Sequence, residues 1–247
     1  MTSGARRLVW LVLLTAASYP LGLALGHRLL LPLLNTAPAY ATLALLVGRD
    51  RRGEAVRAML VWAAVLALVG TWTFAVWPTD PGPRVLNGPQ YRDEMFQWIR
   101  TGEGSEGSPR SFLPQHLLHV AAFVALCLVS ASAVGIALGA VLMNYMAFYV
   151  ASLFRAGVPL WAVALLGWQP WALCRVAAFC VLGVVLAEPL LARLRPYRYE
   201  GLRAARPYLI AAALGILADW ALKALLAPSW GLWLRPLLPG QPLELFR

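Results

Sequence analysis

Long uninterrupted runs of apolar residues recur along the chain and are separated by short polar connections. The run Ala58–Val76 reads AMLVWAAVLALVGTWTFAV and shows no alternation of apolar and polar positions. A helix of this length crosses about 30 Å of hydrocarbon, because each residue adds about 1.5 Å. A membrane β-barrel would instead need period-two alternation in segments of about ten residues. The pattern therefore predicts an all-α, polytopic bundle of transmembrane helices.

Seven spans fit these runs, with ends expected near residues 8–26, 29–47, 58–76, 114–142, 145–168, 171–192 and 207–227. The fifth span contains Gly157 and Pro159, so a re-entrant hairpin there would leave six spans. The first run follows two arginines, as in a signal peptide, but it continues to Gly26, which favours a retained span. We expect a single integral membrane domain over residues 1–247.

Arginine is concentrated in two short connections, Gly48–Arg57 and Ala192–Pro207, and the chain has a formal net charge of +10. Loops rich in arginine stay on the cytoplasmic side of a membrane. We therefore expect a multi-pass protein of the inner or plasma membrane with a cytoplasmic N-terminus and an extracytoplasmic C-terminus. Topology and anionic lipid account for the positive charge, which argues against nucleic acid as a partner. The bilayer is the expected partner, and a membrane protein or a second copy of the chain is a further alternative.

The longest polar connection covers residues 77–113 and is expected on the outer side. Residues 89–101 within it predict a short amphipathic helix, because Pro89 suits a first turn and Gly102 suits an end. Such a helix lies in the membrane surface or folds over the bundle as a lid, and we favour the surface. Residues 228–247 are rich in tryptophan and proline and predict a tail along the outer surface.

Two histidines, His116 and His119, open the fourth predicted span and fall on one helix face. Glu103 and Glu106 precede them in a glycine-rich segment that can reach back toward them. This set predicts acid–base catalysis, with histidine or glutamate as the general base. His116, His119 and Glu106 could also bind a divalent metal such as zinc. Interfacial histidines that contact water or lipid headgroups are the simpler alternative.

The stretch FLPQH, which ends at His116, resembles the Phe-x-x-x-His element of the glutamate-dependent CAAX-type intramembrane proteases. That family's Glu-Glu-x-x-x-Arg element is absent, since the nearest string, DEMFQWIR, places five residues between Glu94 and Arg100. Its later His-x-x-x-Asn element is also missing, because no histidine follows His119. The resemblance covers five residues and does not assign the chain to the family.

Several ionisable residues fall inside predicted spans, where a charge costs about 2.5–3.5 kcal/mol at the centre. Asp219 and Lys223, the chain's single lysine, are four residues apart, which favours an ion pair. Arg155 falls near the centre of the fifth span, and Arg175 lies one turn inside the sixth. Asn144 lies at the turn expected between the fourth and fifth spans. We predict that these five residues contact substrate or carry protons; for the aspartate and lysine, a structural pair is the alternative.

Three functions are compatible with this pattern. The first is a membrane-embedded hydrolase or transferase, whose outward-facing His/Glu/Arg/Asp site acts on a lipid-linked or membrane-anchored substrate. The second is a small transporter or channel subunit that uses Asp219, Lys223 and Arg155. The third is a non-catalytic assembly or scaffold protein whose charges form structural pairs. We expect the enzyme, and the sequence leaves its substrate and reaction open.

Overall fold

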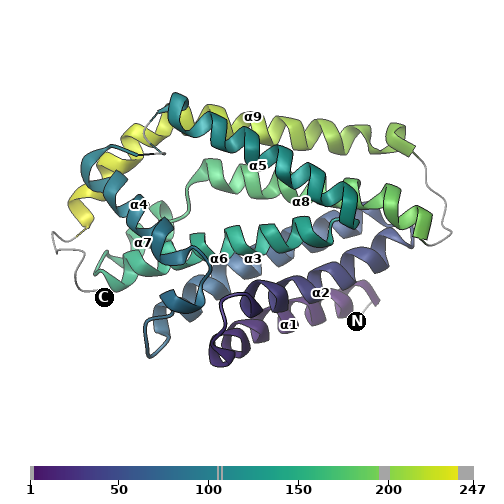
Figure 1. Cartoon of the computed structure of the whole chain (residues 1–247), viewed down its shortest axis with the longest axis horizontal. Helices are drawn as coiled ribbons and strands as arrows, with labels where there is room; N and C mark the ends of the chain where they lie inside the picture. Colours follow the sequence, from purple (N-terminus) through teal and green to yellow (C-terminus); the bar gives the residue numbers. More distant parts are fainter. Residues whose placement is uncertain (1–2, 105, 107, 195–200, 239–247) are drawn as a thin grey trace.

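The computed structural model describes residues 3–104, 106, 108–194 and 201–238, and these residues contain helices and no strand. The helices lie side by side along the long axis of the molecule (Figure 1). Their bounds are α1 (Ser3–Leu25), α2 (Leu30–Val47), α3 (Arg52–Val76), η1 (Gly82–Arg84), α4 (Gly88–Thr101), α5 (Pro109–Ser130), α6 (Ala133–Arg155), α7 (Leu160–Leu166), α8 (Pro170–Leu194), α9 (Gly201–Leu234) and η2 (Arg235–Leu237).

Among the described helices, α1, α2, α3, α5, α6, α8 and α9 are long and apolar enough to cross a membrane by length and composition. The predicted all-α bundle with seven spans is confirmed. Many large apolar side chains point outward from it; Leu68, Val129 and Leu225 are each about three-quarters exposed. An outer surface of this kind needs an apolar solvent. The fold is therefore consistent with a multi-pass protein in contact with lipid.

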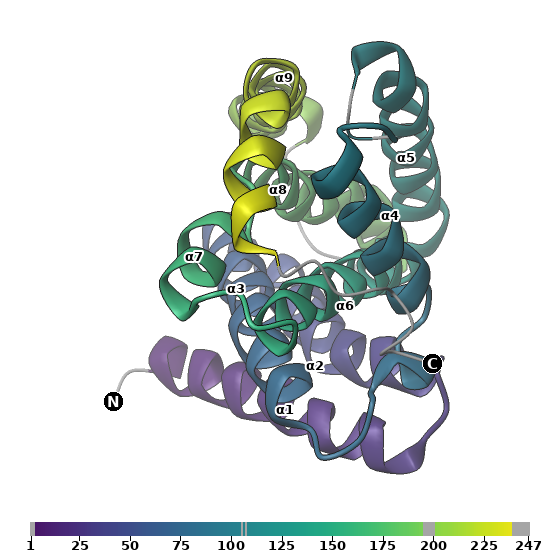
Figure 2. The same ribbon diagram turned by 90° about the vertical axis from the view of Figure 1, so that its left-hand side faces the viewer.

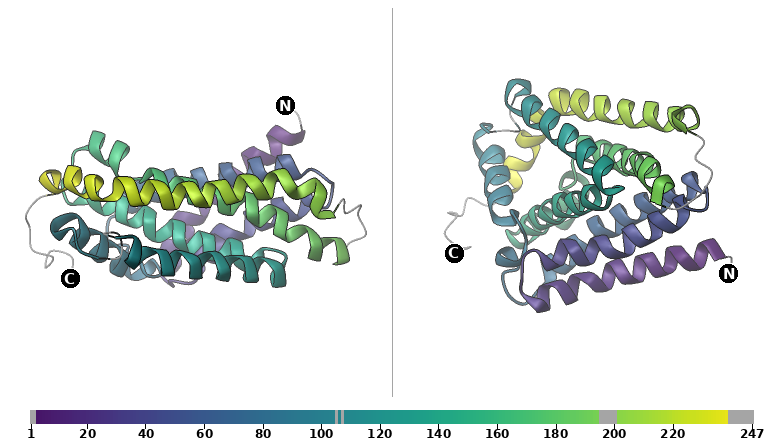
Figure 3. Two further views of the ribbon diagram at one scale, coloured as in Figure 1. Left: turned by 90° about the horizontal axis from the view of Figure 1, so that it is seen from above. Right: turned by 45° about the vertical axis from the view of Figure 1, so that its right-hand side comes forward.

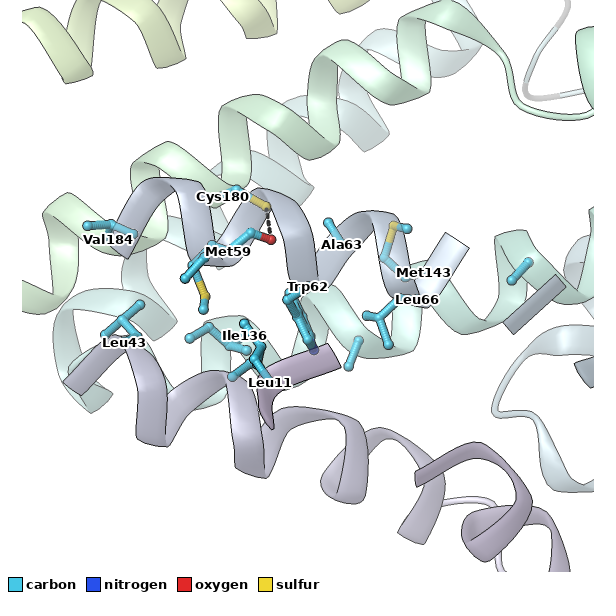
Figure 4. Close-up of a cluster of buried hydrophobic side chains, with 14 of the residues drawn as sticks. Leu11, Leu43, Met59, Trp62, Ala63, Leu66, Ile136, Met143, Cys180 and Val184 are labelled. Atoms are coloured by element: carbon cyan, nitrogen blue, oxygen red, sulfur yellow. Dashed lines mark hydrogen bonds between the residues drawn. The ribbon is translucent and has the colours of Figure 1, made fainter. Parts of the chain in front are cut away.

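The helices are arranged in layers from α1 and α2, through α3 and α6, to α8, α5 and α9 (Figures 1 and 2). The largest hydrophobic core lies between α1, α2, α3, α6 and α8 and includes Leu11, Leu43, Trp62, Ile136 and Val184 (Figure 4). Helices α4 and α7 both lie at one end of the bundle (Figure 1), on opposite sides of it (Figure 2); we call this the α4 end. Helices α5 and α9 both pack against α8, and their axes diverge away from the α4 end (Figure 3).

The turn between the fourth and fifth spans lies at Ala131 and Ser132 and not after residue 142, so the predicted bounds 114–142 and 145–168 are wrong. Both turn residues have positive φ, 48° and 67°, which small side chains tolerate best. The Ser132 N–H donates to the Cys127 carbonyl (2.8 Å), and its hydroxyl donates to the Gly183 carbonyl (2.6 Å). Helices α5 and α6 consequently have 22 and 23 residues, one span each.

The prediction that Arg155 lies near the centre of a broken span is also wrong. Arg155 is the last residue of α6, is exposed, and donates a hydrogen bond to the Trp77 carbonyl (2.7 Å). Gly157, with φ +88°, and Pro159 lead from this helix end into α7. Glycine and proline therefore end the span rather than interrupt it, because proline cannot continue the helical hydrogen-bond pattern.

Helix α4 matches the amphipathic helix predicted over residues 89–101, but it covers the end of the bundle instead of lying apart from it. Met95, Trp98 and Ile99 are buried against α6 and the end of α9. Arg92 is buried as well and lies over the Phe148 ring. Because α4 packs on aromatic side chains of α6, it covers the end of the bundle as a lid and does not lie as a separate surface helix.

The Trp/Pro-rich segment expected as a tail over residues 228–247 begins as part of α9. The helix continues through Pro228 to Leu234, and the Trp230 indole N–H donates to the Leu166 carbonyl (2.9 Å). The Arg235 guanidinium donates to the Ile99 carbonyl of α4 (2.9 Å). These contacts join α9 to α4 and α7, and residues 239–247 lie outside the described residues.

Candidate functional site

A cavity of about 100 Å³ lies between α3, α5, α6 and α8, with Leu43 of α2 in its wall, and reaches α4. Small-molecule sites are commonly apolar pockets in which a few polar groups orient the ligand. Here the polar groups gather at the α4 end, and the remaining wall is apolar. The polar residues of the wall are Tyr91, Glu94, Glu106, Gln115, His116, His119, Tyr145 and Arg175.

His116 of α5 contacts charged side chains from two other helices. Its Nε2 is 2.8 Å from the Arg175 guanidinium of α8 and 3.3 Å from the Lys223 ammonium of α9. Both groups only donate hydrogen bonds, so Nε2 carries a lone pair and no proton. The proton of the neutral ring then lies on Nδ1, which faces the Asp219 carboxylate at 3.4 Å. This tautomer leaves Nε2 as a base.

Lys223 takes its counter-ion from outside its own helix. It is only 1% exposed, and its Nζ lies 2.8 Å from Glu106 Oε2 and 4.6 Å from the centre of the Phe112 ring. Burying an ammonium without such partners destabilises the folded state by about several kcal/mol, because the ion loses its hydration. Glu106 therefore ties the segment between α4 and α5 to α9.

The ion pair predicted between Asp219 and Lys223 is not formed by these two described residues. Asp219 faces His116 and lies 3.8 Å from the Arg175 guanidinium, whereas the lysine pairs with Glu106. Spacing of four residues places both side chains on one face of α9, but neighbouring helices and the α4–α5 segment provide each with another partner. Among the described residues, Asp219 Oδ1 is buried without a hydrogen-bond partner, so this carboxylate can accept a further hydrogen bond.

Two side chains of α4, Tyr91 and Glu94, complete the polar wall. The Tyr91 ring packs on Tyr145 with 4.5 Å between ring centres, and Glu94 accepts a hydrogen bond from Gln90 (2.9 Å). Burial raises the pKa of the Tyr91 hydroxyl well above its ordinary value, and the negative charge of Glu106 raises it further. Tyr91 therefore stays neutral and can donate a hydrogen bond to a ligand oxygen.

The apolar arm of the cavity follows α5, α6 and α8 away from the α4 end. Phe123, Leu142, Met143 and Phe179 line it, together with glycines of α6 and α8. Along α8 the arm spans the positions from Arg175 to Gly183, about 12 Å at 1.5 Å per residue. The arm is narrow, because α5 packs against both α6 and α8.

The structure brings six of the predicted site residues together at the α4 end. His116, His119, Glu106 and Arg175 line the cavity, and Asp219 and Lys223 lie buried directly behind them. They come from α5, α8, α9 and the α4–α5 segment, so the cluster exists only in the folded chain.

Three other predicted residues lie elsewhere. Glu103 is exposed and is not part of the cavity wall, and Arg155 is at the end of α6. Asn144 lies inside α6 rather than at a turn; it accepts a hydrogen bond from the Tyr19 hydroxyl (2.9 Å) and donates one to Asn35 (2.8 Å). This second buried polar cluster joins α1, α2 and α6 and has a structural role.

The metal site predicted at His116, His119 and Glu106 is not assembled. In the part of the chain that the structure describes, no group of three or more His, Cys, Asp or Glu side chains is placed to hold a metal ion. The reason lies in the partners: two cationic groups face His116 Nε2, and Glu106 is paired with Lys223. Nearby positive charges disfavour a divalent cation, so we assign no zinc to this site.

Sequence reasoning missed Tyr91 and Glu94 as site residues. They are three positions apart on an amphipathic helix, so their common direction could be read from spacing. The sequence does not reveal which side of that helix faces the cavity, because this depends on the packing of α4 against α6.

No protein family matches the chain, and no curated protein or solved structure is significantly similar to it. Its function is therefore argued from the residues of the site.

Proposed function

We propose that the protein is a membrane-embedded hydrolase or transferase that acts on a lipid-linked or membrane-anchored substrate. The observation that carries the proposal is the convergence of His116, Arg175, Asp219 and Lys223 at the polar end of an otherwise apolar cavity. Ionisable groups are costly inside a membrane protein and commonly mark a functional site. A pair that served only structure would not need a histidine lone pair at the cavity wall.

In the proposed reaction His116 acts as the general base and then as the general acid. Its Nε2 removes a proton from water or an acceptor hydroxyl while that oxygen bonds to the acyl or phosphoryl centre of the substrate. The same proton then passes to the leaving group. Asp219 holds the ring in the required tautomer and stabilises the imidazolium. Arg175, at the cavity wall, stabilises the negative charge that develops, and Tyr91 can donate to the same oxygen.

We place this site on the extracytoplasmic side of the inner or plasma membrane. The α2–α3 connection, with Arg49, Arg51 and Arg52, lies at the end of the bundle opposite α4. Arginine-rich connections favour the cytoplasm, which leaves the α4 end outside.

The test compares membranes from cells that carry the wild-type chain, the H116A variant, the H27A variant or no copy of the protein. His27 is exposed between α1 and α2 and serves as the matched control. We expect mass spectrometry of lipids and membrane proteins to detect a product that H116A reduces by about 10²-fold or more, as loss of a general base does, while H27A retains it. Identical profiles in all four membranes would reject an enzyme and leave the scaffold as the better explanation.

Transport receives less support from the same geometry. The ionisable residues of the cavity wall form a cluster at one end, the cavity wall beyond Arg175 is apolar, and Arg155 is exposed at the end of α6. A pathway for ions or protons needs polar groups along its length.

A further inference from the structure

We propose that the ligand of this site is an amphiphile with an anionic head group and a single apolar chain. The inference rests on the proposed function and names the substrate class of the same site. The head group, a phosphate or a carboxylate, binds between Arg175 and Lys223. The chain lies in the apolar arm, alongside the stacked rings of Phe123 and Phe179.

Glu106 marks the position of the head group. Its carboxylate belongs to the cavity wall and is 2.8 Å from the Lys223 ammonium, so an anion already occupies the space beside this cation. Arg175 approaches Lys223 from α8, since both cations lie within 3.3 Å of His116 Nε2. An incoming anion can therefore take the place of Glu106 without moving a helix.

The charges at the site stay balanced when this exchange takes place. The cations of Arg175 and Lys223 face the carboxylates of Asp219 and Glu106. If Glu106 left without replacement, a buried positive charge would be uncompensated, which is strongly unfavourable. A ligand anion compensates it, whereas an uncharged head group does not. The site thus discriminates by charge.

Anion binding also activates His116. Without ligand, the Nε2 lone pair accepts a hydrogen bond from Arg175 at 2.8 Å. A phosphate or carboxylate is a stronger acceptor for a guanidinium than a neutral ring nitrogen. When Arg175 and Lys223 both turn to the ligand, Nε2 is released to accept a proton from water. The negative head group is then a condition for catalysis as well as for binding.

The arm accommodates one extended chain and not a helix. A helix with its side chains is about 10–12 Å wide. Helix α5 contacts both α6 and α8 along the arm, so the space between them is narrower than that. Gly139 and Gly183 lack side chains where the arm passes, and the Phe123 and Phe179 rings stack at 4.4 Å beside it. A slot walled by rings and glycines fits an alkyl or isoprenoid chain.

The test measures binding to the purified full chain in nanodiscs by native mass spectrometry. The four probes are hexadecyl phosphate, hexadecanol, butyl phosphate and inorganic phosphate. We expect hexadecyl phosphate to bind at least about tenfold more tightly than each of the others, because it alone has both the charge and the chain. Equal binding of hexadecanol would overturn the charged head group. Equal binding of butyl phosphate or inorganic phosphate would overturn the chain and indicate a simple anion site.

Charge variants test the head-group position. K223Q and R175Q should weaken hexadecyl phosphate binding by about tenfold or more, the usual loss of a charge-assisted hydrogen bond. E106Q should strengthen it, because the competing carboxylate is removed. Its control is E103Q in the same segment, which is exposed outside the cavity wall and should leave the affinity unchanged. Equal affinities for E106Q and E103Q would contradict the exchange. Both glutamate variants keep the two cations of the head-group site, and the amide oxygen of E106Q can still accept a hydrogen bond from Lys223, so both report even where K223Q does not fold.

Cavity-filling variants test the arm. A Cβ atom at Gly139 would meet only the Trp62 ring, at 4.0 Å, so the fold tolerates a side chain there. G139L should weaken hexadecyl phosphate binding at least about tenfold and leave inorganic phosphate unaffected, whereas G139A should resemble the wild type. Unchanged hexadecyl phosphate binding in G139L would place the chain elsewhere.

The proposed ligand class and the proposed enzymatic function can be rejected independently of each other. Formation of a His116-dependent product without binding of hexadecyl phosphate would overturn this inference alone. Binding without any such product would reject the enzyme and leave a site for an anionic amphiphile.

Discussion

His116 differs from the other two histidines of the chain in its surroundings. His27 is exposed, and its Nδ1 accepts a hydrogen bond from the Leu29 N–H (3.3 Å). His119 lines the cavity and is partly exposed. His116 alone is buried with cationic donors at one nitrogen and a carboxylate at the other. At the scale of the residue, this arrangement selects one tautomer, and the tautomer determines which nitrogen can act as a base.

We expect ¹⁵N NMR of histidine-labelled protein to show that His116 carries its proton on Nδ1 and none on Nε2. Three histidines are present, so H27A and H119A spectra assign the signals. The double variant R175M/K223M should remove this bias, because no donor then faces Nε2. A protonated Nε2 in the wild-type spectrum would contradict the proposed role of His116.

At the scale of the element, two kinds of ion pair show how burial decides strength. Arg52 at the start of α3 binds Glu188 of α8 through two hydrogen bonds, and its third nitrogen donates to the Ala204 carbonyl of α9. The side chains of Arg52 and Glu188 are 13% and 5% exposed, respectively. Arg51 and Glu54, one turn apart on α3, are 45% exposed. The buried pair joins three helices at the end opposite α4, and the exposed pair joins none.

We expect R52Q to lower the free energy of unfolding by about 3–5 kcal/mol, because the buried Glu188 carboxylate then loses its ion pair with the Arg52 guanidinium. R51Q should change it by about 0–1 kcal/mol, since water and salt screen the exposed pair. Thermal unfolding in detergent measures both variants. Equal stability of R52Q and R51Q would show that the pair does not hold α3 to α8 and α9.

At the scale of the whole molecule, the two ends of the bundle differ in chemistry. One end carries the arginine-rich α2–α3 connection, and the other carries α4, the cavity and the tryptophans of the last turn of α9. Charge bias orients such a bundle as a unit, because every span is joined to its neighbour by a connection that stays on one side.

This orientation can be tested with a matched pair of glutamate positions. E54C lies at the arginine-rich end and E103C follows α4; both positions are exposed. In a chain whose three cysteines are replaced by alanine, we expect a membrane-impermeant maleimide to label E103C in intact cells and E54C only after lysis. The opposite pattern would invert the topology and place the site in the cytoplasm.

More of the fold than of the site could be predicted from the sequence. Apolar length is a local property and was sufficient to predict seven spans, while Pro89 and Gly102 were sufficient to predict a helix between residues 89 and 101. The turn at Ala131 and Ser132 could not be predicted, because small residues suit both a helix interior and a turn. That turn forms through the Gly183 carbonyl of another helix, a contact that no local pattern contains.

Apolar runs predicted a polytopic helical bundle, favoured seven spans over six and identified the short set of ionisable residues within them. The packing of the helices placed Lys223 against Glu106 instead of Asp219, and it left Glu103 and Asn144 outside the site. The physical reason is that hydrophobic length acts through lipid on each helix separately, whereas a buried charge selects its partner by distance in space. Residues far apart in the chain become neighbours only when the helices pack.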